Sequence, residues 1–305
     1  MRSFSIVLGF LLAAAGAPAR AQDVGSLDPR PLPPLADPDS PTTPAKELFG
    51  RARKAAPMEP DSIGFYSKGC LAGAESLPVD GATWRVMRLS RNRNWGNPAL
   101  IAFLERLAET VPKVSHWPGL LVGDISQPRG GPMLTGHASH QIGLDADIWL
   151  TPMPRRELTR EERELMPATM IVRPDRLDVD PNSWTPDHLA VLRAAAKAPE
   201  TQRIFVNAAI KKALCRDAGP DRDWLSKIRP MYGHDYHFHI RIYCPRGEDR
   251  CDGQDPVPPG DGCDQLAWWF RPAVLHPKPT PHAKPRPPLT MAALPTECRT
   301  VLKAK

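Results

Sequence analysis

The run HDYHFHIRIY at residues 234–243 alternates polar and apolar side chains from His237 onward. Because successive side chains of a β-strand point to opposite faces, this run predicts a strand with one polar and one apolar face. The two sets are His237, His239 and Arg241 on the polar face, and Phe238, Ile240 and Ile242 on the apolar face. The apolar face would pack into a core, which leaves two imidazoles and a guanidinium side by side.

A second run, GHASHQIGLDADIWL at residues 136–150, also alternates in its last part. Apolar residues there alternate with Asp145 and Asp147, which predicts a strand that carries carboxylates on one face. Gly143 before this strand permits a tight turn, so that His140 can approach Asp147. A helix would also place positions seven apart on one face, but the glycine and the alternation argue against it.

The first residues have the pattern of a cleaved secretory signal, with Arg2, an apolar run at residues 6–17 and small residues around Ala21. We expect residues 1–21 to be removed on export. Their loss takes away two arginines and no acidic residue, so the formal charge falls from +6 to +4. This small, scattered excess argues against nucleic-acid binding. Beyond residue 21 no apolar run approaches the roughly 18 to 20 residues of a membrane span, which excludes a membrane-embedded protein.

Proline-rich segments flank the body of the chain. Residues 22–46 contain seven prolines and predict an exposed, extended leader, since proline disrupts helix interiors and central strands. Residues 276–305 form a proline-rich basic tail, which Cys298 would tie back to the domain if that cysteine is paired. Residues 47–275 then form the domain that carries the two alternating runs.

Helix starts and short strands occur between these flanking segments. Asn97-Pro98 and Thr185-Pro186 each place a capping residue and a proline before a helical apolar stripe. Residues 203–207 predict a strand that leads into a helix at 208–214, and residues 223–228 predict one more short helix. Without βαβ alternation or repeats, we predict an α+β fold whose antiparallel β-sheet core carries the site, flanked by helices and disulfide-stapled loops.

The chain contains six cysteines, an even number in a protein that we expect to be exported. Three disulfides are therefore the economical interpretation. Sequence alone does not select the pairing, although Cys244 and Cys251 are close enough to staple one loop. A structural zinc knuckle is the rival interpretation, but no Cys-x-x-Cys pair is present.

Five of the nine histidines lie in the two alternating runs, namely His137, His140, His234, His237 and His239. Clustered protonated histidines would repel one another, whereas neutral imidazoles can bind one divalent cation together. Two imidazoles and a carboxylate with an open fourth position are the ligands of hydrolytic zinc sites. Non-haem iron oxygenases use the same set, but iron(II) suits an oxidising compartment poorly, so we expect Zn²⁺. The motifs HExxH, GxSxG and SxxK are absent, so zincin and serine acyl-enzyme chemistry have no support.

Together the two runs resemble a known family. The pattern HxxGxDxD at residues 140–147, followed by HxxHxHIR at residues 234–241, is similar to the penicillin-insensitive murein endopeptidases. These belong to a wider group of zinc peptidases that includes the lysostaphin-type enzymes and the D-alanyl-D-alanine dipeptidases. The similarity extends over roughly residues 45–300 and includes residues 122–127, the cysteine layout and the secretory signal.

The resemblance implies roles for single residues. It makes His140, Asp147 and His239 the zinc ligands, and it makes His137 an additional ligand or a near neighbour. His237 would be the general base for a zinc-activated water, and His234 would stabilise the oxyanion or protonate the leaving amine. The implied disulfides are Cys70–Cys298, Cys215–Cys263 and Cys244–Cys251.

The resemblance also implies the activity. It indicates a periplasmic zinc metallopeptidase that hydrolyses D-alanyl–meso-diaminopimelyl cross-links, with peptidoglycan as its partner and a homodimer as a candidate assembly. Two alternatives are a D,D-carboxypeptidase or dipeptidase that trims stem peptides, and a non-catalytic murein-binding module. Arg241 would either bind a substrate carboxylate or form a structural ion pair with Asp145 or Asp235.

Overall fold

The computed structural model of the chain describes residues 24–278 and 287–305. The expected signal segment, residues 1–21, and part of the proline-rich tail lie outside the described residues. None of the helices in the described ranges combines the length and the apolar character that crossing a bilayer requires.

A six-stranded sheet in the order β4-β6-β7-β10-β8-β9 forms the centre of the fold. Its strands are β4 (Trp84–Val86), β6 (Leu120–Val122), β7 (Asp145–Trp149), β10 (His237–Ile242), β8 (Thr201–Val206) and β9 (Ile228–Pro230). The α+β class and both predicted site strands are confirmed. The prediction of an antiparallel sheet holds for the four central strands only, because β4–β6 and β8–β9 pair in parallel. In each parallel pair the connection runs through a helix, which returns the chain in the same direction.

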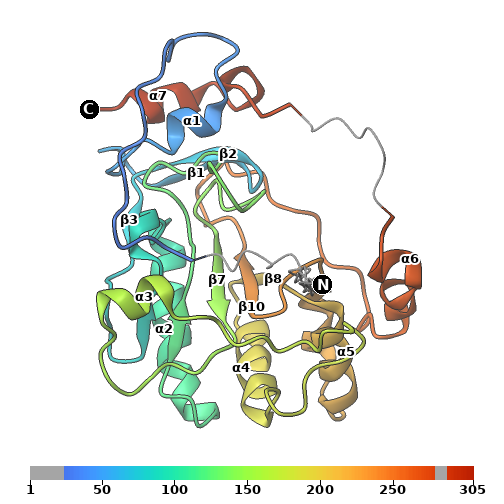
Figure 1. Cartoon of the computed structure of the whole chain (residues 1–305). Helices are drawn as coiled ribbons and strands as arrows, with labels where there is room; N and C mark the ends of the chain where they lie inside the picture. The colour runs from blue at the N-terminus through green and yellow to red at the C-terminus, as the bar shows by residue number, and fades with distance from the viewer. Residues whose placement is uncertain (1–23, 279–286) are drawn as a thin grey trace, which may run out of the picture.

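Three helices lie along one face of the sheet, as Figure 1 shows: α2 (Pro98–Val114), α4 (Pro186–Lys197) and α5 (Ala208–Asp217). The predicted starts of α2 and α4 are confirmed, with proline in the first turn of each. The Asn97 side chain accepts a hydrogen bond from the Ala99 N–H at 2.9 Å, which satisfies one of the free donors at the start of α2. The segment predicted as a short helix at 223–228 is a 3-10 helix, η2 (Asp223–Lys227).

The alternation in β7 and β10 separates the core from the site. Ala146, Ile148, Phe238 and Ile240 are fully buried in one apolar cluster with side chains of α2, α4 and α5. Burial of each of the larger side chains stabilises the fold by about 1.5–3 kcal/mol. The polar residues of the two strands therefore lie together on the opposite face of the sheet.

A second apolar cluster closes one end of the molecule. There α1 (Ala45–Phe49) and α7 (Glu297–Lys303) pack over the hairpin of β1 (Asp61–Phe65) and β2 (Lys68–Ala72), as Figure 1 shows. A disulfide joins Cys70 of β2 to Cys298 of α7, so the tail is tied back to the domain. The other pairs, Cys215–Cys263 and Cys244–Cys251, also confirm the expected connectivity.

The remaining elements are short. Before α1, residues 24–44 contain no helix or named strand, and most of their side chains are exposed. The other strands and helices are β3 (Glu75–Ser76), β5 (Trp95–Gly96), α3 (Arg160–Leu165), α6 (Pro272–Leu275) and the 3-10 helices η1 (Leu89–Arg91), η3 (Asp264–Phe270) and η4 (Met291–Ala293).

Candidate metal centre

The pairing of β7 with β10 brings the two histidine-containing runs together. In this antiparallel register His239 lies directly opposite Asp147, and Arg241 lies opposite Asp145. Residues that face one another across such a pair have Cβ atoms about 4.5–5.5 Å apart. The sheet therefore places an imidazole and a carboxylate from remote parts of the chain side by side.

His140 reaches the same point from the loop before β7. Its backbone adopts a left-handed conformation with φ of 66°, and its N–H donates to Asp145 Oδ2 at 3.0 Å. Its ring Nδ1 lies 2.5 Å from the carbonyl oxygen of Ile125. Because that oxygen can only accept, Nδ1 carries the proton, and Nε2 keeps its lone pair for a metal ion.

Three imidazole nitrogens surround one oxygen of Asp147. His140 Nε2 lies 3.4 Å from Asp147 Oδ1, His239 Nδ1 lies 3.6 Å from it, and His237 Nε2 lies 3.7 Å from it. These separations are long for hydrogen bonds. In a tetrahedral zinc site with bonds of about 2.0–2.2 Å, neighbouring ligand atoms lie about 3.3–3.6 Å apart. The distances of His140 Nε2 and His239 Nδ1 from Asp147 Oδ1 are therefore those of ligands around one small cation, whereas His237 Nε2 lies just outside this range.

Two of these atoms, His140 Nε2 and Asp147 Oδ1, are buried and form no hydrogen bond within the described parts of the chain. The second ring nitrogens of His237 and His239 are also buried without a hydrogen bond, although His239 Nε2 lies 2.9 Å from Asp145 Oδ1. Each unpaired buried polar group costs about 1–3 kcal/mol, unless a ligand compensates for it. Nitrogen and carboxylate ligands of this kind suit Zn²⁺, so the residues present fit the expected ion.

Asp145 lies on the same face of β7 as Asp147 and contacts two residues of β10. Arg241 donates to both of its oxygens, from Nε at 2.7 Å and from Nη2 at 3.2 Å, and His239 Nε2 lies 2.9 Å from Oδ1. Burial by itself would raise the pKa of the Asp145 carboxyl. Arg241 and His239 outweigh this effect and keep that pKa well below its usual range. Of the two roles considered for Arg241, the structure shows the ion pair with Asp145. The carboxylate also directs Nδ1 of His239 towards Asp147.

His137 lies between two carboxylates. Its Nε2 is 3.0 Å from Asp124 Oδ2, and its Nδ1 is 3.5 Å from Asp147 Oδ2. Burial lowers the pKa of His137, but the charges of Asp147 and Asp124 outweigh burial and raise that pKa to about 9. With His140 and Asp147 it forms a group whose ligand atoms all lie within 4.8 Å of one another.

Asp124 was not singled out as a functional residue in the sequence. Arg93 Nη1 lies 2.8 Å and Arg91 Nη1 3.1 Å from its Oδ2, and its carbonyl oxygen accepts a hydrogen bond from the Asp147 N–H. Asp124 therefore supports both His137 and Asp147. The only sequence signal for it was its place within residues 122–127, which belong to the family resemblance.

The last two predicted residues are His237, which lies beside Asp147, and His234, whose ring lies next to that of His237. Burial outweighs the charge of Asp147 and lowers the pKa of His237 to about 3, and burial also lowers the pKa of His234. Both rings are therefore neutral at pH 7, with centroids 4.9 Å apart. His234 Nδ1 lies 2.8 Å from the carbonyl oxygen of Tyr232, which leaves the lone pair on its Nε2.

Asp147 and His237 also line a cavity of about 400 Å³. Its lining includes five aromatic residues, Trp149, Tyr232, Tyr236, Trp269 and Phe270. It also includes three arginines, Arg88, Arg91 and Arg176, and three aspartates, Asp124, Asp147 and Asp235. The size is in the range of ligand-binding pockets. No pattern in the sequence indicated this cavity, because its lining residues are scattered along the chain.

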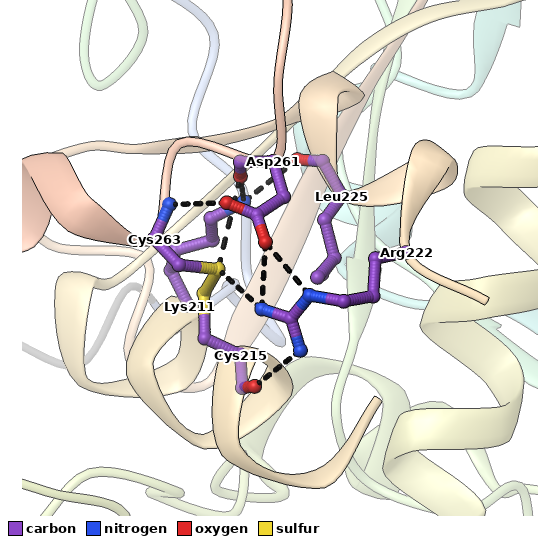
Figure 2. Close-up of a disulfide and its surroundings, with 6 residues drawn as sticks. All are labelled: Lys211, Cys215, Arg222, Leu225, Asp261 and Cys263. Carbon is purple, nitrogen blue, oxygen red and sulfur yellow. Dashed lines mark hydrogen bonds and ion pairs between the residues drawn. A yellow bond between two sulfur atoms is a disulfide. The ribbon is translucent and has the colours of Figure 1, made fainter. Parts of the chain in front are cut away.

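A local network links the chain just before η3 to α5, and Figure 2 shows its disulfide between Cys215 and Cys263. Trp269 and Phe270 belong to η3, which begins directly after Cys263. Lys211 Nζ donates to the carbonyl oxygen of Asp261 at 2.5 Å, and the Asp261 carboxylate accepts from the Cys263 N–H at 2.9 Å. The covalent link and these bonds hold the start of η3 in place.

Comparisons with known proteins give one consistent family. The model of the family described as "Penicillin-insensitive murein endopeptidase" matches residues 62–303. The protein of that name from Haemophilus influenzae is 46% identical over 227 residues, which cover 72% of this chain and 78% of the relative. Proteins of the same name from Klebsiella pneumoniae and Pectobacterium atrosepticum are 43% and 42% identical over 247 and 245 residues. These matches cover 79% and 80% of this chain, and 85% and 84% of the relatives.

Proposed function

Because the chain belongs to the penicillin-insensitive murein endopeptidase family, we propose that it is a peptidase that cleaves peptide cross-links of murein in the periplasm. The bond proposed is the amide between D-alanine and meso-diaminopimelate. Similar length and more than 40% identity to several relatives of that name support this assignment. The structural observation that carries it is the ring of three imidazole nitrogens around Asp147 Oδ1, at the edge of a cavity large enough for a peptide.

The ion proposed for the site is zinc, with His140 Nε2, Asp147 Oδ1 and His239 Nδ1 as its ligands. When bound, zinc would polarise the scissile carbonyl and lower the pKa of water to about 7. We place His137 outside this ligand set, since its Nε2 is engaged by Asp124. Its Nδ1 faces Oδ2 of Asp147, so His137 would orient that carboxylate.

His237 and His234 are proposed to move the protons of the reaction. Hydrolysis of an amide requires that the attacking water loses a proton and that the departing nitrogen gains one. His237 is neutral, buried and beside Asp147, so it can accept the proton of the water. His234 presents the lone pair of Nε2, because its Nδ1 is directed at the Tyr232 carbonyl, and it can take part in returning a proton to the amine.

The test is incubation of purified murein sacculi with the protein, with and without a chelator, followed by mass analysis of the fragments. Conversion of cross-linked dimers into monomers, lost with chelator and restored by zinc, is expected. Shortening of monomers without loss of dimers would indicate the alternative carboxypeptidase. Binding to sacculi without any cleavage would indicate the non-catalytic alternative.

Variants connect the activity to single residues. His140→Ala and His239→Ala should abolish cleavage and lose the bound zinc, whereas His237→Asn should keep the zinc and lower kcat by about 10²–10⁴-fold. His116→Ala is the matched control, because this histidine is 97% exposed and absent from the lining of the cavity. Full activity in either ligand variant would refute the proposed ligand set.

A further inference from the structure

The cavity beside the histidine cluster contains three arginines, and two of them are already engaged. Arg88 donates to two main-chain carbonyl oxygens, and Arg91 donates to Asp124 at 3.1 Å. Arg176 lines the same cavity, but its side chain makes no hydrogen bond or ion pair with any described residue. Its guanidinium is therefore available to a ligand in the cavity.

The loop that carries Arg176 supplies no partner for it. Asp175, the preceding residue, pairs with Arg173 at 2.8 Å. Asp178 pairs with Lys212 at 3.0 Å, and Arg216 approaches it at 3.2 Å. The loop is closed by main-chain hydrogen bonds, including one from the Arg176 N–H to the carbonyl oxygen of Arg173 at 2.9 Å. Asp175 and Asp178 are thus committed to other cations.

The backbone of Arg176 is unusual in a way that it shares with the site. In the described ranges only five residues other than glycine have a positive φ, and Arg176 is one of them, at 58°. Three of the other four belong to the histidine cluster or the cavity lining: His140, His234 and Arg88. A left-handed conformation is unfavourable for such side chains, and strained backbone of this kind concentrates at functional sites. The strain supports a functional role for the position of Arg176.

From these observations we infer that Arg176 binds a free carboxylate of the peptide in the cavity and thereby selects an acidic substrate. The inference rests on the proposed function, because it concerns the same site and the same substrate. A guanidinium binds a carboxylate through two parallel hydrogen bonds, and the aromatic walls of the cavity would keep water from this pair. A murein cross-link offers two such groups, the carboxylate of diaminopimelate and the C-terminal carboxylate of the stem peptide. Either one, held by Arg176, would position the scissile amide beside Asp147 and His237.

The experiment compares synthetic cross-linked peptides by calorimetry in the presence of a chelator, so that binding is measured without cleavage. One peptide carries all its carboxylates, a second is amidated at diaminopimelate, and a third is amidated at the C-terminus. For the wild-type protein, one of the two amidations should weaken binding on the order of tenfold to hundredfold, which identifies the carboxylate recognised. The Arg176→Ala variant should bind the unmodified peptide more weakly by a similar factor. It should also bind the unmodified peptide and the discriminating amidated peptide with equal affinity.

Two further variants separate recognition from general charge. Arg176→Lys should recover part of the affinity, because it keeps the charge but loses the paired geometry. Arg106→Ala removes an exposed positive charge that pairs with Glu200 at the surface and is absent from the cavity lining, so the ratio between acid and amide should stay unchanged. Alanine at 176 adds no steric conflict at the positive φ, since arginine already carries a Cβ atom.

The outcomes distinguish the two proposals. The inference about Arg176 is overturned if the wild-type protein binds the unmodified peptide and both amidated peptides with equal affinity. It is also overturned if the Arg176→Ala variant still prefers the unmodified peptide by the same factor as wild type. If the preference depends on Arg176 but the zinc-loaded protein leaves cross-linked murein intact, carboxylate recognition stands and the proposed endopeptidase activity falls. Steady-state kinetics of the zinc-loaded protein should show the effect of Arg176→Ala mainly in KM for the unmodified peptide.

Discussion

Asp145→Asn tests the support beneath the candidate metal centre. Asp145 is fully buried and accepts two hydrogen bonds from Arg241, which is itself only 5% exposed, and it approaches His239 Nε2 at 2.9 Å. Asparagine keeps the size of the side chain but removes its charge, so the Arg241 guanidinium stays buried without a counter-ion. Breaking a buried ion pair in this way costs about 3–5 kcal/mol of the free energy of unfolding.

The same substitution should weaken metal binding. Since the carboxylate directs Nδ1 of His239 towards Asp147, its loss should lower zinc affinity by about 10–100-fold, as for other residues that orient metal ligands. Urea unfolding of the metal-free protein measures the first effect, and zinc titration against a competing chelator measures the second. Unfolding must be metal-free, because bound zinc would add its own stabilisation.

The loss of unfolding free energy in Asp145→Asn should depend on pH. The folded pKa of Asp145 lies far below the unfolded value of about 3.9, so its stabilisation is fully present above that value and is lost as pH falls through the folded pKa. The difference in unfolding free energy between wild type and Asp145→Asn should therefore be constant between pH 6 and pH 8 and shrink in acid. Asp175→Asn is the control, because this half-exposed carboxylate pairs with Arg173 at the surface and should cost less than about 1 kcal/mol.

A double variant separates stability from metal binding. Replacing both partners, Asp145→Leu with Arg241→Met, removes the buried charges together, and such replacements are often neutral for stability. The double variant should recover most of the lost unfolding free energy but none of the zinc affinity. An Asp145→Asn protein with wild-type stability and wild-type zinc affinity would refute the role given to Asp145.

Two further predictions concern the anchor of η3 and the buried lysine beside it. Replacing Cys215 and Cys263 with serine opens a loop of 48 residues and should lower the free energy of unfolding by about 4 kcal/mol. It should also raise KM while the zinc content stays the same. The same change at Cys244 and Cys251 should lower the free energy of unfolding by about 2 kcal/mol and leave KM unchanged. A wild-type KM in the first variant would contradict the anchoring role. Burial lowers the pKa of Lys211 to about 7, so at this residue the unfolded chain binds more protons between pH 7 and pH 10, and the contribution of Lys211 to the free energy of unfolding should rise over that interval. In urea titrations, the difference in unfolding free energy between wild type and Lys211→Met should therefore change in favour of wild type from pH 7 to pH 10, and a constant difference would contradict the prediction.

Local patterns in the sequence were sufficient for several elements and for the choice of candidate residues. The period of two in residues 144–150 and 237–242 predicted β7 and β10, and it separated the core face from the site face correctly. The capping residue and proline before α2 and α4 predicted where those helices begin. These features succeed because backbone conformation and the direction of each side chain depend mainly on residues a few positions away. The disulfide pairing, by contrast, came from the family resemblance.

The geometry of the site depends on contacts between remote segments, which no local pattern contains. The register that sets His239 opposite Asp147 results from packing of the whole sheet, and a shift by one residue would turn His239 into the core. The ring of His140 is oriented by the carbonyl oxygen of Ile125, and Arg176 reaches the cavity from a loop outside both histidine runs. Each of these arrangements arises only when distant parts of the chain share one core, so the folded chain turns a set of suitable residues into a site with defined distances and charges.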